Sequence, residues 1–498
     1  MTASRYIIYF IVATIPIVFA AVQPWVWSFY TACIVLAFLV LFLQKAGGQV
    51  WGNREVRPWK PRGVFIFSVG LFFFVTLLQC LPIPKSAVSF FSPFRYQLLS
   101  QSRALIGRPF DLATISYAPL TSFAWWVFLL GLFLFFLVFC KSITSDRDLK
   151  VLISILLVVS FLEAIYGLFQ ALVPSLGVLW VDYIKNYLGD ARGTYINRNH
   201  FAGFMEMMLP LGLAYTLAMG NWRKKLSFKA LISSDRPNFQ FFLSIGLVVM
   251  TLALLLSRSR AGIFGGVLGF VTFALLMRSS SGELPRSFWV MISVIVGMVS
   301  FYSLKIGIDP VLERFLRISK DTSRLDIWHD SLAMIKDHPF GIGLAAFKQV
   351  FPVYNVSNFT DVKFLYLHND YLQLLAEAGW IGFLALVAGF YIFLVKSILK
   401  IRRMHLHSDP MKYFLAIGAL SGLVSMAFHS FFDFNLHMPA NAVYFVMLIA
   451  LVYHCAWQGG TEVGSQRSEV GSRRAKGRKS EVRGRKSEVG SLYSEIRV

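Results

Sequence analysis

The chain has 498 residues, of which 56% are hydrophobic and 16% aromatic, a composition too apolar for a soluble globular protein. Its formal net charge of +22 would suit a nucleic-acid partner, but the basic residues fall in short clusters between apolar runs. Charge placed in this way is typical of loops at a membrane surface, so we predict no nucleic-acid partner. The four cysteines lie inside apolar runs and predict neither a disulfide framework nor thiol chemistry.

Apolar runs long enough to cross a bilayer recur along most of the chain, and we predict about twelve transmembrane helices. They cover residues 6–22, 25–43, 64–81, 122–140, 150–172, 200–219, 241–257, 261–277, 288–306, 371–395, 413–431 and 438–457. The first run lacks a convincing cleavage site and is followed directly by a second, which favours a retained helix over a signal peptide. The expected fold is therefore an all-α polytopic membrane protein.

Basic clusters decide the expected orientation. Every even-numbered span ends in one, so the positive-inside rule predicts that both termini are cytoplasmic. Residues 1–457 would form the integral membrane domain. Residues 458–498 repeat SEV units among Arg, Lys and Gly, and predict a disordered basic cytoplasmic tail. This tail either touches anionic lipid headgroups or is solvated without a specific role.

Four segments are expected on the outer side. Residues 82–121, rich in proline and serine, predict an irregular loop. Residues 173–199 end in GTYINRNHFAG, and a short junction reads SRSRAG. The largest segment, about 307–370, contains an amphipathic helix over 323–337 that lies on the outer mouth of the bundle. Its expected apolar stripe is Leu325, Trp328, Leu332 and Ile335, and Pro339 and Gly341 should end it.

The stretch HNDYLQLLAEAGWIG places His368 where an apolar span meets water. The positive end of the helix dipole disfavours a charged imidazole there, which keeps a neutral base available. Gly379 and Gly382 lie one turn apart and would let a neighbouring helix approach closely. The alternative is an interfacial histidine that only caps a helix, with glycines that only pack.

Arginines on the outer side are the next candidates. Arg258 and Arg260 lie at a short junction between spans, where ionisable residues are costly and point to function, the alternative being contact with outer headgroups. Arg324 lies on the amphipathic helix, where a solvated role is the alternative. Guanidinium groups stay charged and grip phosphate oxygens bidentately, so they suit a diphosphate ligand.

Further polar residues surround these candidates. Arg192, Asn197, Asn199 and His200 would bind sugar hydroxyls or phosphate, unless Asn199 simply caps a helix that starts at His200. Asn369 is a further candidate for substrate binding, and Asp433 either orients a partner such as an arginine or forms a structural salt bridge. Asp326 and Asp330 are expected on a solvated face. No acidic cluster on the outer segments suggests a metal site.

These motifs resemble the bacterial O-antigen ligase and O-antigen polymerase superfamily, the Wzy_C-type membrane glycosyltransferases, best over residues 193–439. The pattern consists of GTYINRNHFAGF, Ser259-Arg260-Ala261-Gly262, His368-Asn369 with Gly379 and Gly382, and the set Arg324, Trp328, Pro339, Gly341, Gly343 and Phe347. The resemblance implies a GT-C-like fold and a metal-independent, inverting enzyme without a cofactor. It also implies that His368 is the base and that Arg260 and Arg324 hold the diphosphate, with Arg260 favoured over Arg258.

The resemblance also implies the substrates. The donor would be a glycan on undecaprenyl diphosphate, and the acceptor a lipid or glycolipid hydroxyl such as that of the lipid A core, on the periplasmic side of the inner membrane. An O-antigen ligase is expected first, and a polymerase or a protein O-oligosaccharyltransferase are alternatives that share the motifs. From another class, a lipid-linked glycan flippase or a secondary transporter would also suit about twelve helices.

Overall fold

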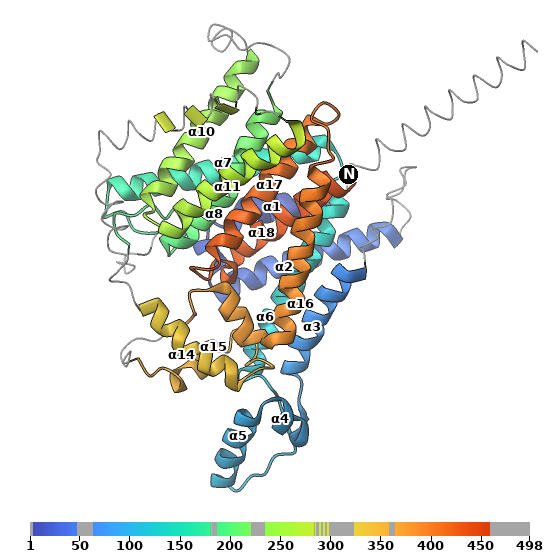
Figure 1. Cartoon of the computed structure of the whole chain (residues 1–498), viewed down its shortest axis with the longest axis vertical. Helices are drawn as coiled ribbons and strands as arrows, with labels where there is room; N and C mark the ends of the chain where they lie inside the picture. The colour runs from blue at the N-terminus through green and yellow to red at the C-terminus, as the bar shows by residue number, and fades with distance from the viewer. Residues whose placement is uncertain are drawn as a thin grey trace, which may run out of the picture.

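The computed structural model describes residues 3–46, 63–179, 181, 187–220, 235–282, 284, 288–289, 292–293, 296–297, 323–357 and 364–458. Its long helices are α1 (Ala3–Thr14), α2 (Pro24–Ala46), α3 (Gly63–Cys80), α6 (Pro119–Ser142), α7 (Asp146–Leu172), α8 (Arg198–Ala218), α10 (Asp235–Leu256), α11 (Arg260–Ser281), α16 (Asp370–Ile401), α17 (Pro410–His429) and α18 (Pro439–Val452). The last is extended by η5 (Tyr453–Gln458). Within these ranges the chain is an all-α polytopic membrane protein (Figure 1).

Among the described residues, nine helices are long and apolar enough to cross a membrane, and α1 and α3 are shorter apolar helices. The predicted first span is interrupted: α1 ends at Thr14, and η1 (Phe19–Ala21) follows with positive φ angles. Pro16 explains the break, because a helix rarely continues into a proline. Most of the predicted span 288–306, and residues 459–498 of the predicted tail, lie outside the described residues.

Helices α8 and α17 form the centre of the bundle. Helix α8 is buried on nearly all sides, as expected for a helix that is apolar all round. Gly418 and Gly422 of α17 allow its close approach, since a Cβ on either would lie 2.7 Å from a carbonyl oxygen of α8. Helices α2 and α16 bury far less of their surface and lie at the outside of the bundle.

Several helix ends gather at one end of the bundle, here called the α14 end. Helices α8, α11 and α16 begin there, and α17 ends there beside η4 (Asn435–His437). Helices α14 (Ser323–Asp337) and α15 (Phe347–Val350) lie against this end (Figure 1). The first turns of three helices therefore point their unpaired N–H groups and positive dipole ends toward the same region.

Residues 82–121 are not the irregular loop that we predicted. They form α4 (Lys85–Phe91) and α5 (Pro93–Leu105), closed by the short antiparallel strands β1 (Ile83–Pro84) and β2 (Leu112–Ala113). Pro93 is the first residue of α5, a position where its fixed φ favours a helix. This unit projects from the α14 end beyond α3 (Figure 1).

Helix α16 is broken at Gly379, where φ is 69° and ψ is 177°. The gap is filled by residues 339–343: Ile342 N–H donates to the carbonyl of Ala376, and Trp380 N–H donates to that of Pro339, each at 3.0 Å. These bonds satisfy backbone N–H and C=O groups that the break leaves without partners in the helix. The glycine therefore admits a loop rather than a neighbouring helix, and our expectation for it was wrong in this respect.

Helix α14 spans the predicted residues, but only Trp328 and Ile335 of the predicted stripe lie on its buried side. Ile327 and Met334 are buried against the first half of α16, whereas Leu325 and Leu332 are 60% and 55% exposed. Trp328 lies on the buried side, and its indole N–H donates to the carbonyl of Leu367 at 2.8 Å. The helix ends as expected before Pro339, and Gly341 follows with a positive φ.

Candidate active site

His368 and Asp433 form the centre of the candidate site. Nδ1 of His368 lies 3.2 Å from Oδ1 of Asp433. The His368 side chain is 29% exposed and that of Asp433 only 1%. The imidazole therefore faces the outside of the protein, with the carboxylate buried behind it.

Three further predicted residues lie close to the carboxylate of Asp433. Asn199 donates from Nδ2 to Oδ2 of Asp433 at 2.6 Å. Nη2 of Arg324 lies 3.8 Å from the same oxygen, and Nε2 of His200 lies 3.9 Å from Oδ1. Arg324 is fixed further by donating from Nη1 to the carbonyl of Phe432 at 2.6 Å. We call His368, Asp433, Asn199, His200 and Arg324 the Asp433 cluster.

The charge of Asp433 determines which nitrogen of His368 carries the proton. Burial alone would raise the pKa of Asp433, but the hydrogen bond from His368 and the positive charge of Arg324 hold it well below its usual range. An ionised carboxylate only accepts hydrogen bonds, so Nδ1 of His368 must be the donor. The lone pair of a neutral ring is then on Nε2, where it is available to accept a proton.

The backbone around His368 is held in an uncommon conformation. His368 has a φ of 52°, in the left-handed region that costs energy for a residue with a side chain. Asn369 caps α16, because its side chain accepts from the N–H groups of Tyr371 and Leu372 at 3.0 Å. The Asp370 N–H donates to the carbonyls of Ser430 and Asp433. Asn369, predicted to bind substrate, is thus occupied as a helix cap in this structure.

A buried ionic group that we did not predict lies beside the first turn of α16. His437 donates from Nδ1 to Asp370 at 2.7 Å, and its Nε2 is 4.0 Å from Glu377. Burial alone would lower the pKa of His437, but its bonds to these two carboxylates raise it to about 10. His437 is therefore an imidazolium at neutral pH, and it ties η4 to the first half of α16.

Glu377 also connects this group to the turn that fills the break of α16. It accepts from the Ala345 N–H at 2.7 Å and from Nε2 of Gln373 at 2.6 Å. Gln373 in turn accepts from the Leu367 N–H at 2.7 Å, one residue before His368. An ionisable residue within an apolar span needs interior partners, and these contacts supply them to Glu377.

A second cluster lies on the other side of the first turn of α8. Asp190 is buried and pairs with Arg198, and Nη1 of Arg258 lies 3.1 Å from its other oxygen. Arg258 has a φ of 52°. Because Arg198 directly precedes Asn199, this Asp190 cluster is adjacent to the Asp433 cluster. We did not select Arg198, although a charged residue at the start of a buried span is a signal that could have identified it.

The remaining predicted residues have separate positions. Arg260 is the first residue of α11 and is half-buried. Arg192 is almost completely buried, and its backbone N–H donates to Gln170 at 3.2 Å. Asn197 caps α8 by accepting from the Asn199 N–H at 2.9 Å.

Two expectations are corrected here. Asn199 does not cap a helix that starts at His200, because Asn197 caps one that starts at Arg198. This shift leaves the Asn199 amide available for Asp433. Asp330 is not solvated either: it is buried and accepts from Ser357 Oγ at 2.8 Å and from the Val356 N–H at 3.2 Å. It anchors the segment after α15 to α14.

A further buried pair lies within the bundle. His429, at the end of α17, is 3.0 Å from Glu206 of α8, and neither side chain is exposed. The carbonyl of His429 accepts from the Asp433 N–H at 3.1 Å, so the pair lies directly behind the Asp433 cluster. Ionisable residues at such depth are costly and need partners, which these two supply to each other.

Comparison with known proteins shows a similarity to one family over part of the chain. Residues 245–387 match the sequence profile of a family described as O-antigen ligase. The matched segment contains Arg258, Arg260, Arg324 and His368, but not Asn199 or Asp433, which the fold brings to them. It is shorter than the range 193–439 over which we expected the resemblance.

An uncharacterised protein of Haemophilus influenzae is similar to this chain at 24% identity. The similar region covers 37% of this chain and 56% of that protein. The chain is therefore aligned with only about half of the length of this relative.

Proposed function

We propose that the chain, whose residues 245–387 match the profile of the O-antigen ligase family, transfers a glycan from undecaprenyl diphosphate to an acceptor hydroxyl. The acceptor that we favour is the lipid A core, as in an O-antigen ligase. The observation that carries the proposal is the pair of a partly exposed His368 and a buried Asp433, with Arg324 beside them.

In the proposed reaction, the acceptor oxygen attacks the anomeric carbon of the donor sugar while Nε2 of His368 takes the hydroxyl proton. The bond between that carbon and the phosphate oxygen breaks, and undecaprenyl diphosphate leaves with the electron pair. Asp433 holds the imidazole in the required tautomer and stabilises the imidazolium that forms, as the carboxylate of a catalytic triad does. A single displacement of this kind inverts the anomeric configuration.

The arginines would stabilise the leaving group. Arg324 is 34% exposed, and only part of its guanidinium is used by Phe432 and Asp433. Arg258 is 29% exposed on its side chain and lies in the neighbouring Asp190 cluster. Fixed guanidinium charge of this kind stabilises negative charge that develops on a diphosphate without a metal ion. Arg260, at the first turn of α11, adds positive charge at the same end of the bundle.

Charge distribution supports a periplasmic site. The end of the bundle opposite α14 carries exposed or half-buried basic residues at Arg147, Lys150, Arg278, Lys396, Lys400, Arg402, Arg403 and Lys412. The positive-inside rule would place that end in the cytoplasm. The Asp433 cluster would then face the periplasm of the inner membrane, and both termini the cytoplasm. Residues 1–457 would be the membrane domain and 458–498 a cytoplasmic tail.

A secondary transporter is the second class to be weighed. A helix broken near Gly379 is a feature of transporters, whose breaks line a substrate path. Here the break is filled by residues 339–343 and sealed by backbone hydrogen bonds. This packing favours an enzyme with a rigid site over a transporter with an open path.

Purified protein in liposomes, supplied with lipid-linked glycan and lipid A-core acceptor, tests the proposal. We expect glycan to appear on the acceptor, and His368→Ala to lose about 10²–10⁴-fold in rate, the range for general base catalysis. His329→Ala is the matched control, because that side chain is 84% exposed on α14. Transfer should continue in EDTA, since arginines supply the positive charge.

Each other outcome contradicts a defined part of the proposal. Near-normal turnover of His368→Ala would exclude it as the base. Glycan that lengthens on the donor lipid would indicate a polymerase, and glycan on a protein acceptor would indicate an oligosaccharyltransferase. Movement of unchanged donor between leaflets would indicate a transporter. Activity lost in EDTA and restored by Mn²⁺ would show that a metal is required.

A further inference from the structure

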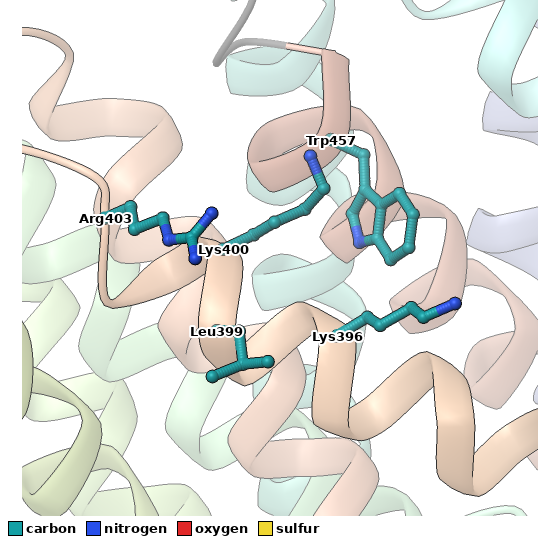
Figure 2. A pocket seen from close by; sticks show the side chains of 5 residues that line it. All are labelled: Lys396, Leu399, Lys400, Arg403 and Trp457. Atoms are coloured by element: carbon teal, nitrogen blue, oxygen red, sulfur yellow. The ribbon is translucent and has the colours of Figure 1, made fainter.

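A basic pocket lies at the end of the bundle opposite the candidate site. It is lined by Lys396, Leu399, Lys400, Arg403 and Trp457 and has a volume of about 180 Å³ (Figure 2). Thirty residues of α16 separate Asp370 from Lys400, which corresponds to a distance on the order of 40 Å. The pocket is therefore independent of the Asp433 cluster and of the proposed reaction.

The lining is strongly cationic. Three of the five lining residues are Lys or Arg, and none is acidic. Of the described carboxylates near this end of the bundle, Asp409 lies 3.0 Å from Lys412 and Asp148 pairs with Arg5, while Asp146 is exposed at the start of α7 and does not line the pocket. Arg403 and Lys400 present donors that suit phosphate oxygens. The volume is below the range of about 300–1,000 Å³ typical of sites for whole drug-sized ligands, so a small headgroup suits it better.

One wall of the pocket is rigid. The indole N–H of Trp457 donates to Ser397 Oγ at 3.0 Å, and its ring stacks on Phe393 and Tyr453 with centroids 6.1 Å apart in each case. Nζ of Lys400 lies 4.9 Å from the centre of the indole, within cation–π range. This contact places the lysine amine beside the ring at the pocket, as Figure 2 shows.

An apolar track leads from the pocket along the membrane-facing side of α16. Leu399 is 47% exposed, Val395 37% and Tyr391 66%. These residues are four apart and so lie on one face of the helix. A soluble phosphate compound would make no use of this surface, whereas the acyl chain of a lipid would cover it. The track and the cationic pocket together suit a ligand with both a phosphate and an acyl chain.

We propose that this pocket binds the headgroup of an anionic phospholipid, with an acyl chain along Leu399, Val395 and Tyr391. The phosphate would lie between Lys396, Lys400 and Arg403, at the level where Trp457 marks the membrane–water interface. The protein would then retain one such lipid at a defined position, in addition to the diffuse attraction of a basic protein for anionic membranes.

Native mass spectrometry of the full-length protein in detergent tests this site, with phosphatidylglycerol and phosphatidylcholine as probes. We expect Arg403→Gln to weaken retention of phosphatidylglycerol about fivefold, because the substitution removes one charge contact with the lipid phosphate. The double variant Lys400→Gln with Arg403→Gln removes two such contacts and should weaken retention about 25-fold. Arg402→Gln is the matched control, because Arg402 is also exposed but does not line the pocket. It should change retention less than twofold.

Thermal unfolding without added lipid should be the same for Arg403→Gln and Arg402→Gln, since both side chains are exposed. Equal loss in Arg402→Gln would overturn the proposal in favour of diffuse charge. Equal retention of phosphatidylcholine would overturn it as well. Displacement by an equal concentration of glycerol phosphate would identify a site for soluble phosphate compounds. None of these results depends on whether the protein transfers glycans.

Discussion

At the scale of single residues, the candidate site depends on one buried carboxylate. Asp433 receives a bond from His368, a bond from Asn199 and the charge of Arg324, which come from three different parts of the chain. Breaking a buried ionic group by removing one member leaves the others without compensation. Asp433 is therefore the residue whose replacement should affect the site most, apart from His368.

Asp433→Asn should lower kcat about 10²–10⁴-fold, with little change in KM for the donor. The asparagine amide can donate to Nδ1 of His368, which would leave the proton on Nε2 and remove the base. Steady-state transfer by the purified variant, compared with Asp111→Asn in an exposed surface ion pair, measures this effect. Equal activity of the two variants would show that Asp433 does not control the tautomer.

At the scale of elements, two devices position the first turn of α16. The break at Gly379 is filled by residues 339–343, and His437 ties η4 to Asp370 at 2.7 Å. Both act on the same half-helix, whose N-terminus carries His368. The strained backbone of His368 can persist because the surrounding bonds hold it on both sides.

The stability of this arrangement should depend on pH through His437. Its pKa is raised to about 10 in the folded protein, compared with about 6.5 in an unfolded chain. The ionic group therefore stabilises the fold fully below pH 6.5, and this contribution is lost as pH rises toward 10. We expect the thermal unfolding midpoint of the wild type to fall over this range more than that of His437→Gln.

The measurement is thermal unfolding in detergent between pH 6 and pH 10. His407→Gln serves as the control, since His407 is exposed on the opposite end of the bundle and should retain the wild-type slope. If His437→Gln showed the same slope as the wild type, the ionic group would not be protonated as described.

At the scale of the whole molecule, the two ends of the bundle differ in how their positive charge is held. At the α14 end, Arg198 and Arg258 pair with Asp190, and Arg324 lies beside Asp433. At the opposite end Arg5 pairs with Asp148, but Lys396, Lys400 and Arg403 line the pocket of α16 with no acidic residue in the lining. Buried, paired charge is typical of a site, whereas charge along a rim is typical of the cytoplasmic surface.

Cysteine labelling should show this asymmetry directly. In a variant without the four native cysteines, Ser102→Cys on α5 should react with a membrane-impermeant maleimide in spheroplasts. Ser408→Cys, at the opposite end, should react only after permeabilisation. Both serines are exposed, so accessibility to the reagent differs only by the side of the membrane. The reverse pattern would place the Asp433 cluster in the cytoplasm.

The sequence alone determined the fold class and most helix positions, because apolar runs of membrane length need no partner to be recognised. It also identified His368, Arg324, Asn199, His200 and Asp433 as candidates, each from its local motif. Their roles in the reaction remain predictions. Helix α14 was placed correctly from its periodicity, but only half of its predicted apolar stripe is buried, since the surface it packs on comes from α16.

Only the tertiary structure decided which candidates meet. Asn199 and Asp433 are separated by 234 residues, and no local pattern specifies a contact over that distance. The roles of Gly379 and His437 could not be predicted from the sequence either. Gly379 packs against the remote residues Phe340 and Gly341, and His437 pairs with Glu377 of another helix. Hydropathy reports where a helix lies, whereas burial, pairing and protonation depend on the neighbours that folding supplies.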